Sequence, residues 1–184
     1  MTSKTSVRAA IQASRASMTD EYRETQRAAI RARVLSHCTM LGVPRGTAIA
    51  AYQPLRTEPG SVQLLEDLHG AGYRVLVPIT LADRDLDWRY WFPADAPAAP
   101  TLGLAAISSA ALVLVPAFAV DHDGNRLGRG GGSYDRALAR VSTRTEVAAL
   151  LYDGELLVEV PVDGWDRPVT ATVQPSGWTT VGTR

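Results

Sequence analysis

The sequence has little of several features that commonly reveal a function. It contains one cysteine, Cys38, in 184 residues, which excludes an internal disulfide and a zinc site built from several cysteines. Its 19 basic and 19 acidic residues cancel, so we expect no binding to nucleic acid, which requires a basic surface. The longest apolar run, Ala110–Val120, contains Pro116 and is too short to cross a bilayer.

The N-terminal segment also lacks a continuous apolar stretch, so residues 1–17 do not have the pattern of a secretory signal. We therefore expect no membrane partner and a cytoplasmic location. Apolar residues make up 46% of the chain and charged residues 21%, which is ordinary for a soluble globular protein. A chain of this length is expected to form one domain over residues 1–184, acting as a monomer on small molecules.

Hydrophobic periodicity predicts alternating helices and strands. Helices are predicted at residues 3–17, 19–41, 61–70 and 133–141, and strands at 47–52, 73–79, 111–116, 146–152 and 169–173. The strand, helix and strand between residues 47 and 79 form a βαβ unit, which implies parallel pairing. We therefore predict an α/β fold with three layers: a mostly parallel, doubly wound central sheet with helices on both faces.

Some side chains and connecting segments have more specific predictions. The buried face of the first helix is predicted to contain Val7, Ala10, Ile11 and Ser14. In the second helix we expect a core thiol at Cys38, a structural histidine at His37, and solvated arginines at positions 23, 27, 31 and 33. Residues 85–92 form either an extra strand over a ligand pocket or an ordinary packed strand. Residues 93–100 are expected to be a mobile loop, and the tail from Pro175 to be loosely ordered.

Glycine is concentrated in one stretch, where five of the fifteen glycines fall between Gly124 and Gly132. A predicted strand precedes this stretch and a predicted helix follows it. Glycines allow tight turns and close approach of a ligand, and successive backbone N–H groups can form a nest for an anion. The start of the following helix adds unsatisfied N–H groups, and Arg126 and Arg129 add positive charge. The stretch therefore favours phosphate or polyphosphate.

The established glycine motifs do not describe this loop. It has no P-loop pattern, and the spacing Gly128-x-Gly130-x-x-Ser133 lacks the third glycine of the dinucleotide fingerprint. The alternative is a tight turn between a strand and a helix that is merely rich in glycine. A turn does not require two arginines, so we favour a phosphate site.

Residues 125–135 read Asn-Arg-Leu-Gly-Arg-Gly-Gly-Gly-Ser-Tyr-Asp and follow Val115-Pro116-Ala117-Phe118 and Asp123-Gly124. This pattern resembles the signature of the 5-formyltetrahydrofolate cyclo-ligases, also called methenyltetrahydrofolate synthetases. The glycine spacing, the Arg-Leu pair and the Tyr-Asp pair agree, whereas Ser133 stands where tyrosine is usual. The resemblance spans Lys4 to Asp166. It implies a ligase that converts 5-formyltetrahydrofolate to 5,10-methenyltetrahydrofolate with ATP and Mg²⁺, releasing ADP and phosphate.

The resemblance also implies one ATP site that is built from two segments of the chain. Lys4 and Arg8 lie four residues apart, so they share one helix face; charge alone suggests a solvated basic face. The resemblance instead implies that both reach the ATP phosphates. It assigns the rest of the ATP site to the loop residues Arg126, Leu127, Gly128, Arg129, Gly130, Gly131, Gly132, Ser133 and Tyr134. Charge neutralisation during phosphoryl transfer makes Arg129, Lys4 and Arg126 the catalytic candidates.

The folate and metal sites follow from the same resemblance. Glu58 matches the glutamate that holds the pterin, because a carboxylate can accept from two N–H groups at once; the alternative is an exposed acid before a helix. Gln53 is a further candidate for the same pocket because of its place at the end of a predicted strand, and the remaining substrate-binding candidates are Arg129, Gly130, Gly131, Gly132 and Ser133. Asp135 and Asp166 match the magnesium-binding aspartates, whereas without the resemblance Asp135 would complement a helix dipole and Asp166 would belong to a turn.

Two other functions remain open from the sequence. Ser133, Glu155 (where the family tends to have glutamine) and the altered segment after Glu58 are consistent with a non-catalytic folate- or nucleotide-binding protein on the same fold. A sugar-phosphate or acyl-transfer enzyme on the same architecture is the second alternative, because a fold does not determine a function.

Overall fold

The computed structural model describes residues 3–93 and 100–182. Its centre is a seven-stranded sheet with inner strands that are parallel and edge strands that are antiparallel to their neighbours. The order is β10 (Gly177–Thr180), β9 (Ala171–Gln174), β7 (Glu146–Leu150), β4 (Ala110–Pro116), β1 (Ala48–Ala50), β2 (Arg74–Thr80) and β3 (Leu86–Tyr90). Three of the inner strands, β1, β4 and β7, consist mainly of buried apolar residues, as expected for a sheet covered on both faces.

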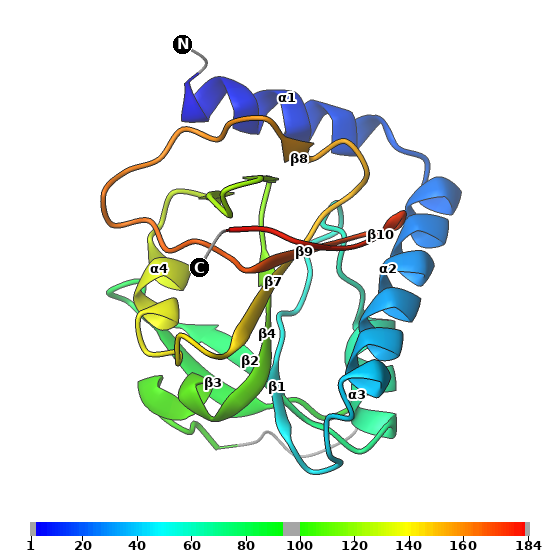
Figure 1. The fold of residues 1–184 in the computed structure, drawn as a ribbon, viewed down its shortest axis with the longest axis vertical. Helices are drawn as coiled ribbons and strands as arrows, with labels where there is room; N and C mark the ends of the chain where they lie inside the picture. Colours follow the sequence, from blue (N-terminus) through cyan, green and yellow to red (C-terminus); the bar gives the residue numbers. More distant parts are fainter. Residues whose placement is uncertain (1–2, 94–99, 183–184) are drawn as a thin grey trace.

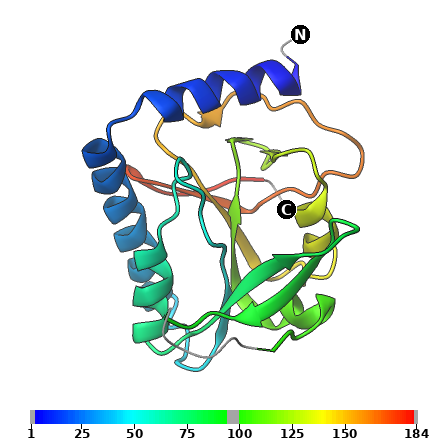
Figure 2. The ribbon, with the colours of Figure 1, turned by 180° about the vertical axis from the view of Figure 1, so that it is seen from behind.

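Helices cover both faces of this sheet (Figures 1 and 2). On one face α2 (Asp20–Met40) and α3 (Val62–Gly70) pack through side chains such as Val34 and Leu68. On the other face, the 3-10 helix η1 (Leu104–Ser109) and α4 (Ser133–Leu138) contribute Ile107 and Ala137. The predicted three-layer α/β fold is therefore confirmed, although α4 ends three residues before the predicted helix.

A second, three-stranded sheet was not predicted. It consists of β6 (Arg126–Leu127), β5 (Ala119–Asp121) and β8 (Leu156–Leu157). Helix α1 (Lys4–Ser17) lies across it (Figure 1), where Ile11 packs against Phe118 and Val160. The strand β4 is therefore followed by the hairpin of β5 and β6, whose turn contains Gly124, and Gly128–Gly132 follow β6.

Helix α1 buries part of the predicted face, because Val7 and Ile11 pack against the small sheet. Ala10 and Ser14 are exposed, whereas Ile11 and Arg15 are buried. Arg15 can occupy the buried face because its Nε and Nη2 donate to Glu155 at 2.7 and 2.8 Å, and Nη2 also donates to the Ala117 carbonyl at 2.7 Å. A search for apolar residues misses this position, because a buried charge is tolerated only with such partners.

The prediction of a loosely ordered tail after Pro175 is wrong. Strand β10 pairs with β9 along its whole length, and Trp178 stacks on His37 with ring centroids 3.6 Å apart. The Nε2 atom of His37 also lies 2.7 Å from Glu146 Oε2. The structural assignment of His37 is therefore confirmed, as is the burial of Cys38 in the core.

The prediction that the α2 arginines are solvated is wrong for two of them. Arg23 is buried and donates to the backbone carbonyls of Arg15 and Met18, which anchors the turn between α1 and α2. Arg27 is half-buried and donates to the carbonyls of Arg56 and Glu58. Both guanidinium groups satisfy backbone oxygens in turns, which helix periodicity cannot reveal.

Strand β3 is a packed edge strand, since Trp88 is completely buried in the core. The predicted loop at 93–100 lies largely outside the described residues. Within the described ranges, no helix combines the length and the apolar character that crossing a membrane requires.

An ion pair fixes the end of α4 against the start of β3. Both terminal nitrogens of Arg140 donate to the carboxylate of Asp85, at 2.9 and 2.6 Å. Asp85 precedes Leu86, and Arg140 lies just after α4, which itself follows the glycine-rich loop. The hydrogen bonds from Arg140 hold the pKa of the Asp85 carboxyl below its ordinary value.

We predict that Asp85→Asn destabilises the fold by about 1.5–3 kcal/mol at pH 7, the usual contribution of hydrogen bonds to a charged group. The folded pKa of Asp85 is lower than the unfolded one, so the stabilisation is complete above pH ~4 and is lost as the pH falls through the folded value. Thermal unfolding from pH 7 to pH 2 checks this, because the two proteins should converge in acid. Asp67→Asn, which breaks an exposed ion pair with Arg31, should cost less than ~1 kcal/mol. A constant gap between Asp85→Asn and the wild type at all pH values would contradict the prediction.

Candidate functional site

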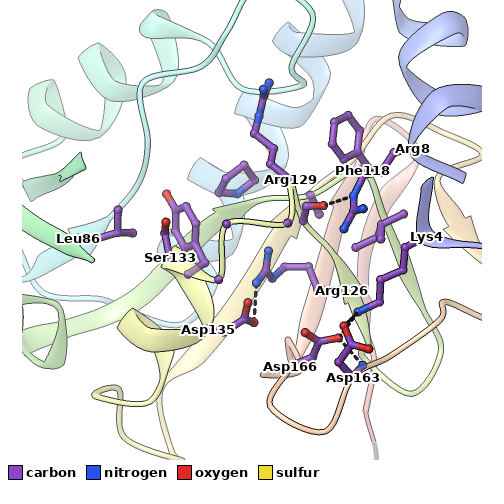
Figure 3. A pocket seen from close by; sticks show the side chains of 18 of the residues that line it. Lys4, Arg8, Leu86, Phe118, Arg126, Arg129, Ser133, Asp135, Asp163 and Asp166 are labelled. Atoms are coloured by element: carbon purple, nitrogen blue, oxygen red, sulfur yellow. Dashed lines mark hydrogen bonds and ion pairs between the residues drawn. The ribbon is translucent and has the colours of Figure 1, made fainter. Parts of the chain in front are cut away.

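The candidate site is a cavity of about 280 Å³ beside the carboxyl ends of β2 and β4 (Figure 3). This edge is where open α/β sheets bind their ligands. Its walls come from α1, the segment around Glu58, the ends of β2 and β4, the start of β3, the glycine-rich loop and residues 163–166. Residues that are far apart in sequence therefore meet around one space.

The glycine-rich loop is shaped by a buried arginine beneath it. Arg126 is 7% exposed, and its Nη2 donates to Asp135 Oδ1 at 2.9 Å. A Cβ atom at Gly128 would lie 2.5 Å from Arg126 Nη1, which is too close for any other residue to fit without a shift. Gly130 and Gly132 have φ values of +93° and +69°, a conformation that favours glycine. Glycine is therefore required at Gly128 by the close approach of Arg126, and is favoured at Gly130 and Gly132 by their left-handed backbone.

Arg8 connects α1 to this loop. Its Nε donates to the Gly128 carbonyl at 2.7 Å, and its Nη2 lies 3.5 Å from the position that a Cβ of Gly130 would take. Among residues 3–93 and 100–182, Arg8 has no carboxylate within ion-pair distance. Its charge is therefore available to an anionic ligand over the loop.

Lys4 bridges two aspartates at one end of the cavity (Figure 3). Its Nζ lies 2.8 Å from Asp163 Oδ2 and 2.7 Å from Asp166 Oδ2. Partial burial disfavours its charge, but the hydrogen bonds to both carboxylates raise the pKa of the Lys4 ammonium. Burial also opposes ionisation of Asp166, yet the hydrogen bonds from Lys4 and from the Asp163 amide lower the pKa of its carboxyl. Lys4 and Asp166 are therefore both charged at neutral pH.

Glu58 presents a carboxylate to the cavity. It is 6% exposed, so the alternative of an exposed acid is wrong. Its Oε2 accepts from the Leu55 amide at 2.8 Å, and its Oε1 accepts from Arg129 Nη2 at 3.2 Å. The Arg129 side chain is 55% exposed and lies over the Phe118 ring, with Cζ 5.8 Å from the centroid. This long ion pair leaves both groups free to contact a ligand.

The structure brings together all but one of the site residues predicted from the sequence. The cavity is lined by Lys4, Arg8, Glu58, the loop residues Arg126 to Tyr134, Asp135 and Asp166. Gln53 is the exception, since it is exposed and does not line the cavity. The chain turns away after β1, so that Glu58 faces the cavity in its place.

Several lining residues were missed by the sequence analysis, among them Arg15, Phe118, Asp163 and Trp165. A signal existed for Arg15, which follows Lys4, Arg8 and Ile11 at helical spacing on one face. Its partner Glu155 is buried, and burial raises the pKa of the Glu155 carboxyl although Arg15 opposes this. Burial likewise raises the pKa of Tyr134, which keeps its hydroxyl protonated.

The aspartates next to the loop suit a magnesium ion that is shared with phosphate. Asp135 uses Oδ1 for Arg126 and the Arg167 amide, and Asp166 uses Oδ2 for Lys4. In the described part of the chain, the second oxygen of each carboxylate accepts no hydrogen bond, and no group of three or more His, Cys, Asp or Glu could hold a metal by itself. Mg²⁺ commonly binds through one or two carboxylates plus substrate phosphates, so the residues fit that mode.

The fold and the site together define a class of protein. It is an α/β protein whose cavity combines Arg8, which has no carboxylate partner among the described residues, the loosely paired Arg129, a glycine-rich loop and a carboxylate at the carboxyl edge of a parallel sheet. Such a site suits an anionic ligand bound beside a second ligand that offers N–H groups to Glu58.

Comparison with known proteins agrees with this class and identifies the family within it. The profile of the 5-formyltetrahydrofolate cyclo-ligase family matches residues 1–175. The chain is 36% identical to the 5-formyltetrahydrofolate cyclo-ligase of Mycolicibacterium smegmatis, covering 94% of both chains. It is 39% identical to the enzyme of that name from Escherichia coli K12 over 66 residues, 35% of this chain and 36% of the other. The chain therefore belongs to the 5-formyltetrahydrofolate cyclo-ligase family, an enzyme family, as its glycine-rich motif predicted.

Solved structures show the same fold. A 5,10-methenyltetrahydrofolate synthetase from Mycoplasma pneumoniae superposes with a TM-score of 0.78 at 20% identity, covering 92% of this chain and 97% of the other. The 5,10-methenyltetrahydrofolate synthetase of Aquifex aeolicus gives 0.72 at 20% identity, covering 98% and 94%. The three-layer architecture is therefore common to relatives of low sequence identity.

We predict that Gly131→Ala leaves the fold intact but weakens anion binding. A Cβ at this position would meet only Ser133 Oγ, at 3.5 Å, and its φ is not left-handed, so stability should stay the same or rise by up to ~1 kcal/mol. The added methyl group would occupy space where loop amides meet a ligand. Thermal unfolding and calorimetric titration with inorganic tripolyphosphate measure the two effects.

Gly124→Ala is the matched control for this prediction. Its Cβ would lie 2.3 Å from the Val169 carbonyl oxygen, and its φ is +85°, so it should destabilise the fold by more than ~1 kcal/mol. If Gly131→Ala binds tripolyphosphate as tightly as the wild type, the anion does not lie against the loop.

Proposed function

We propose that this protein catalyses the ATP- and magnesium-dependent conversion of 5-formyltetrahydrofolate to 5,10-methenyltetrahydrofolate, with release of ADP and phosphate. One observation carries the proposal: the family's basic residues at the start of the chain, Lys4 and Arg8, line the same cavity as the glycine-rich loop and Glu58. These groups are separated by up to 128 residues along the chain, and a polyphosphate site next to a carboxylate accounts for their convergence.

The triphosphate is proposed to lie over the glycine-rich loop. Arg8 is bound to the loop backbone and has no acidic partner in the described residues, and Arg129 is only loosely paired with Glu58. Both guanidinium groups can therefore donate to phosphate oxygens without first breaking a strong ion pair. Arg126, by contrast, is paired with Asp135 below the loop, so its main contribution is to hold the loop amides in position.

The folate is proposed to lie between Glu58 and the far wall of the cavity. The Glu58 carboxylate is held by the Leu55 amide, and it can accept from a ring N–H and an exocyclic amino group of the pterin. Pro78, Thr80 and Leu86 line the same cavity and offer an apolar wall to a flat ring. The N5-formyl group would then face the phosphates near Arg129.

The chemistry that this arrangement suits is phosphoryl transfer followed by ring closure. The formyl oxygen attacks the γ-phosphorus, the bond to the bridging oxygen breaks and ADP leaves. The N10 amine then attacks the activated formyl carbon, and phosphate leaves with the formyl oxygen as N10 loses its proton. The protein aligns the two ligands and balances the charge that moves with the phosphoryl group. Arg129 and Arg8 supply that positive charge, and Lys4 can add to it from the end of the cavity.

Mg²⁺ would be held by Asp135 and Asp166 through their free oxygens and would neutralise phosphate charge when bound. The binding roles of these residues are part of the proposal. The hydrogen bonds from Lys4 to Asp166 and from Arg126 to Asp135 hold the two carboxylates beside the loop.

The proposal is tested by incubating the protein with ATP, Mg²⁺ and 5-formyltetrahydrofolate and following the near-ultraviolet absorbance of the methenyl product. Product should form only when all three are present. Binding of either ligand without product would instead identify a non-catalytic binding protein, and turnover of another substrate without ATP would identify a different enzyme on this fold.

In the same assay Arg129→Ala should reduce kcat by roughly 10²–10³-fold, the usual cost of removing one donor to developing negative charge. Arg144→Ala is the matched control, because Arg144 is exposed on a loop and does not line the cavity. Normal turnover of Arg129→Ala would show that this guanidinium does not meet the phosphates.

Asp135→Asn should raise the magnesium concentration needed for half-maximal activity by about tenfold or more, because a neutral amide is a weaker ligand for a hard cation. Magnesium titration at saturating ATP measures this, and Asp153→Asn, an exposed acid away from the cavity, serves as the control. An unchanged titration curve would remove Asp135 from the metal site.

A further inference from the structure

One lining residue of the cavity has no role in the chemistry described above. Trp165 lies between Asp163 and Asp166 in sequence and lines the cavity, yet it is 74% exposed. The other three tryptophans are held by the protein: Trp88 and Trp91 are buried in the core, and Trp178 stacks on His37. An exposed indole that lines a cavity offers its flat face to a ligand for stacking.

The position of Trp165 is fixed by its two neighbours. Asp163 and Asp166 both bind Lys4, and the Asp163 amide donates to Asp166 Oδ2 at 2.8 Å. The tight turn that carries Trp165 is therefore anchored to the first turn of α1. The Trp165 side chain is therefore exposed, while the backbone of its turn is held by Asp163, Asp166 and Lys4.

The location of this turn selects one of the two ligands. Figure 3 shows Lys4, Asp163 and Asp166 at one end of the cavity, with Leu86 and Ser133 at the other. Trp165 belongs to the end with Lys4 and Arg8, where the phosphates are proposed to lie. The wall opposite to it, with Leu86, is the one assigned to the pterin.

On the basis of the proposed function, we propose that the indole of Trp165 stacks on the purine base of the nucleotide. A polyphosphate held by Lys4, Arg8 and the loop brings its attached nucleoside to this end of the cavity. An aromatic ring stacks on a base in a manner that tolerates different bases, so Trp165 adds affinity for a nucleoside triphosphate over bare polyphosphate and selects adenine only weakly.

The test compares ATP with inorganic tripolyphosphate, which has the phosphates and lacks the base. Trp165→Ala should weaken ATP binding, measured by calorimetry, roughly 5- to 150-fold, which is the range expected for loss of one stacked base. It should leave tripolyphosphate binding and the KM for 5-formyltetrahydrofolate unchanged. Trp165→Phe should restore most of the ATP affinity, because the ring is retained.

Val158→Ala is the matched control, because Val158 is 93% exposed on the same segment and does not line the cavity. Equal losses for ATP and tripolyphosphate in Trp165→Ala would overturn the proposal, since Trp165 would then act by positioning the Lys4 cluster. A change in the folate KM alone would overturn it as well, because the ring would then stack on the pterin.

Tryptophan fluorescence provides a readout in the wild-type protein. Because Trp165 is the most exposed tryptophan, acrylamide quenching should fall when ATP binds and should not change with tripolyphosphate. If the wild type makes product but Trp165→Ala binds ATP normally, only the stacking proposal fails. If the wild type binds no ATP, the proposed function fails first.

Discussion

The ion pair between Arg126 and Asp135 determines the shape of the site. Its guanidinium lies directly beneath Gly128 and connects β6 to the start of α4, so the loop between them has one backbone path. The Nε of Arg8 donates to the carbonyl of the same residue, Gly128. Two arginines thus contact the glycine-rich segment, Arg126 by lying against Gly128 and Arg8 by donating to its carbonyl.

Sequence reasoning identified the layers of the fold because buried parallel strands and amphipathic helices have strong periodic patterns. The small sheet was missed because β5, β6 and β8 are only two or three residues long, below the length at which alternation can be detected. Strand β10 was missed because its residues, Gly177 to Thr180, follow Pro175 and Ser176, which are typical of a turn. Its order depends on pairing with β9 and on the ring of His37, which are tertiary contacts.

The site was predictable to the extent that its residues belong to a motif. The glycine-rich loop, Lys4, Arg8 and Glu58 have recognisable spacing or position, and the structure brings them to one cavity. Trp165 has no such motif, and Arg15 has only its helical spacing from Lys4 and Arg8, because its burial depends on Glu155, a distant partner. Gln53 shows the opposite error: its position at a strand end suggested the pocket, but the backbone turns it outward.

The site is completed by contacts between the two ends of the chain. Lys4 and Arg15 in the first helix bind Asp163, Asp166 and Glu155, about 140 to 160 residues later. During synthesis by a ribosome, domains fold as their chain emerges, and here the N-terminal helix must wait for nearly the whole chain before its charged partners exist. Until then a buried arginine and an ammonium group have no counterions. The charged wall of the cavity can therefore form only after Asp166 has been synthesised, so a shorter nascent chain lacks it.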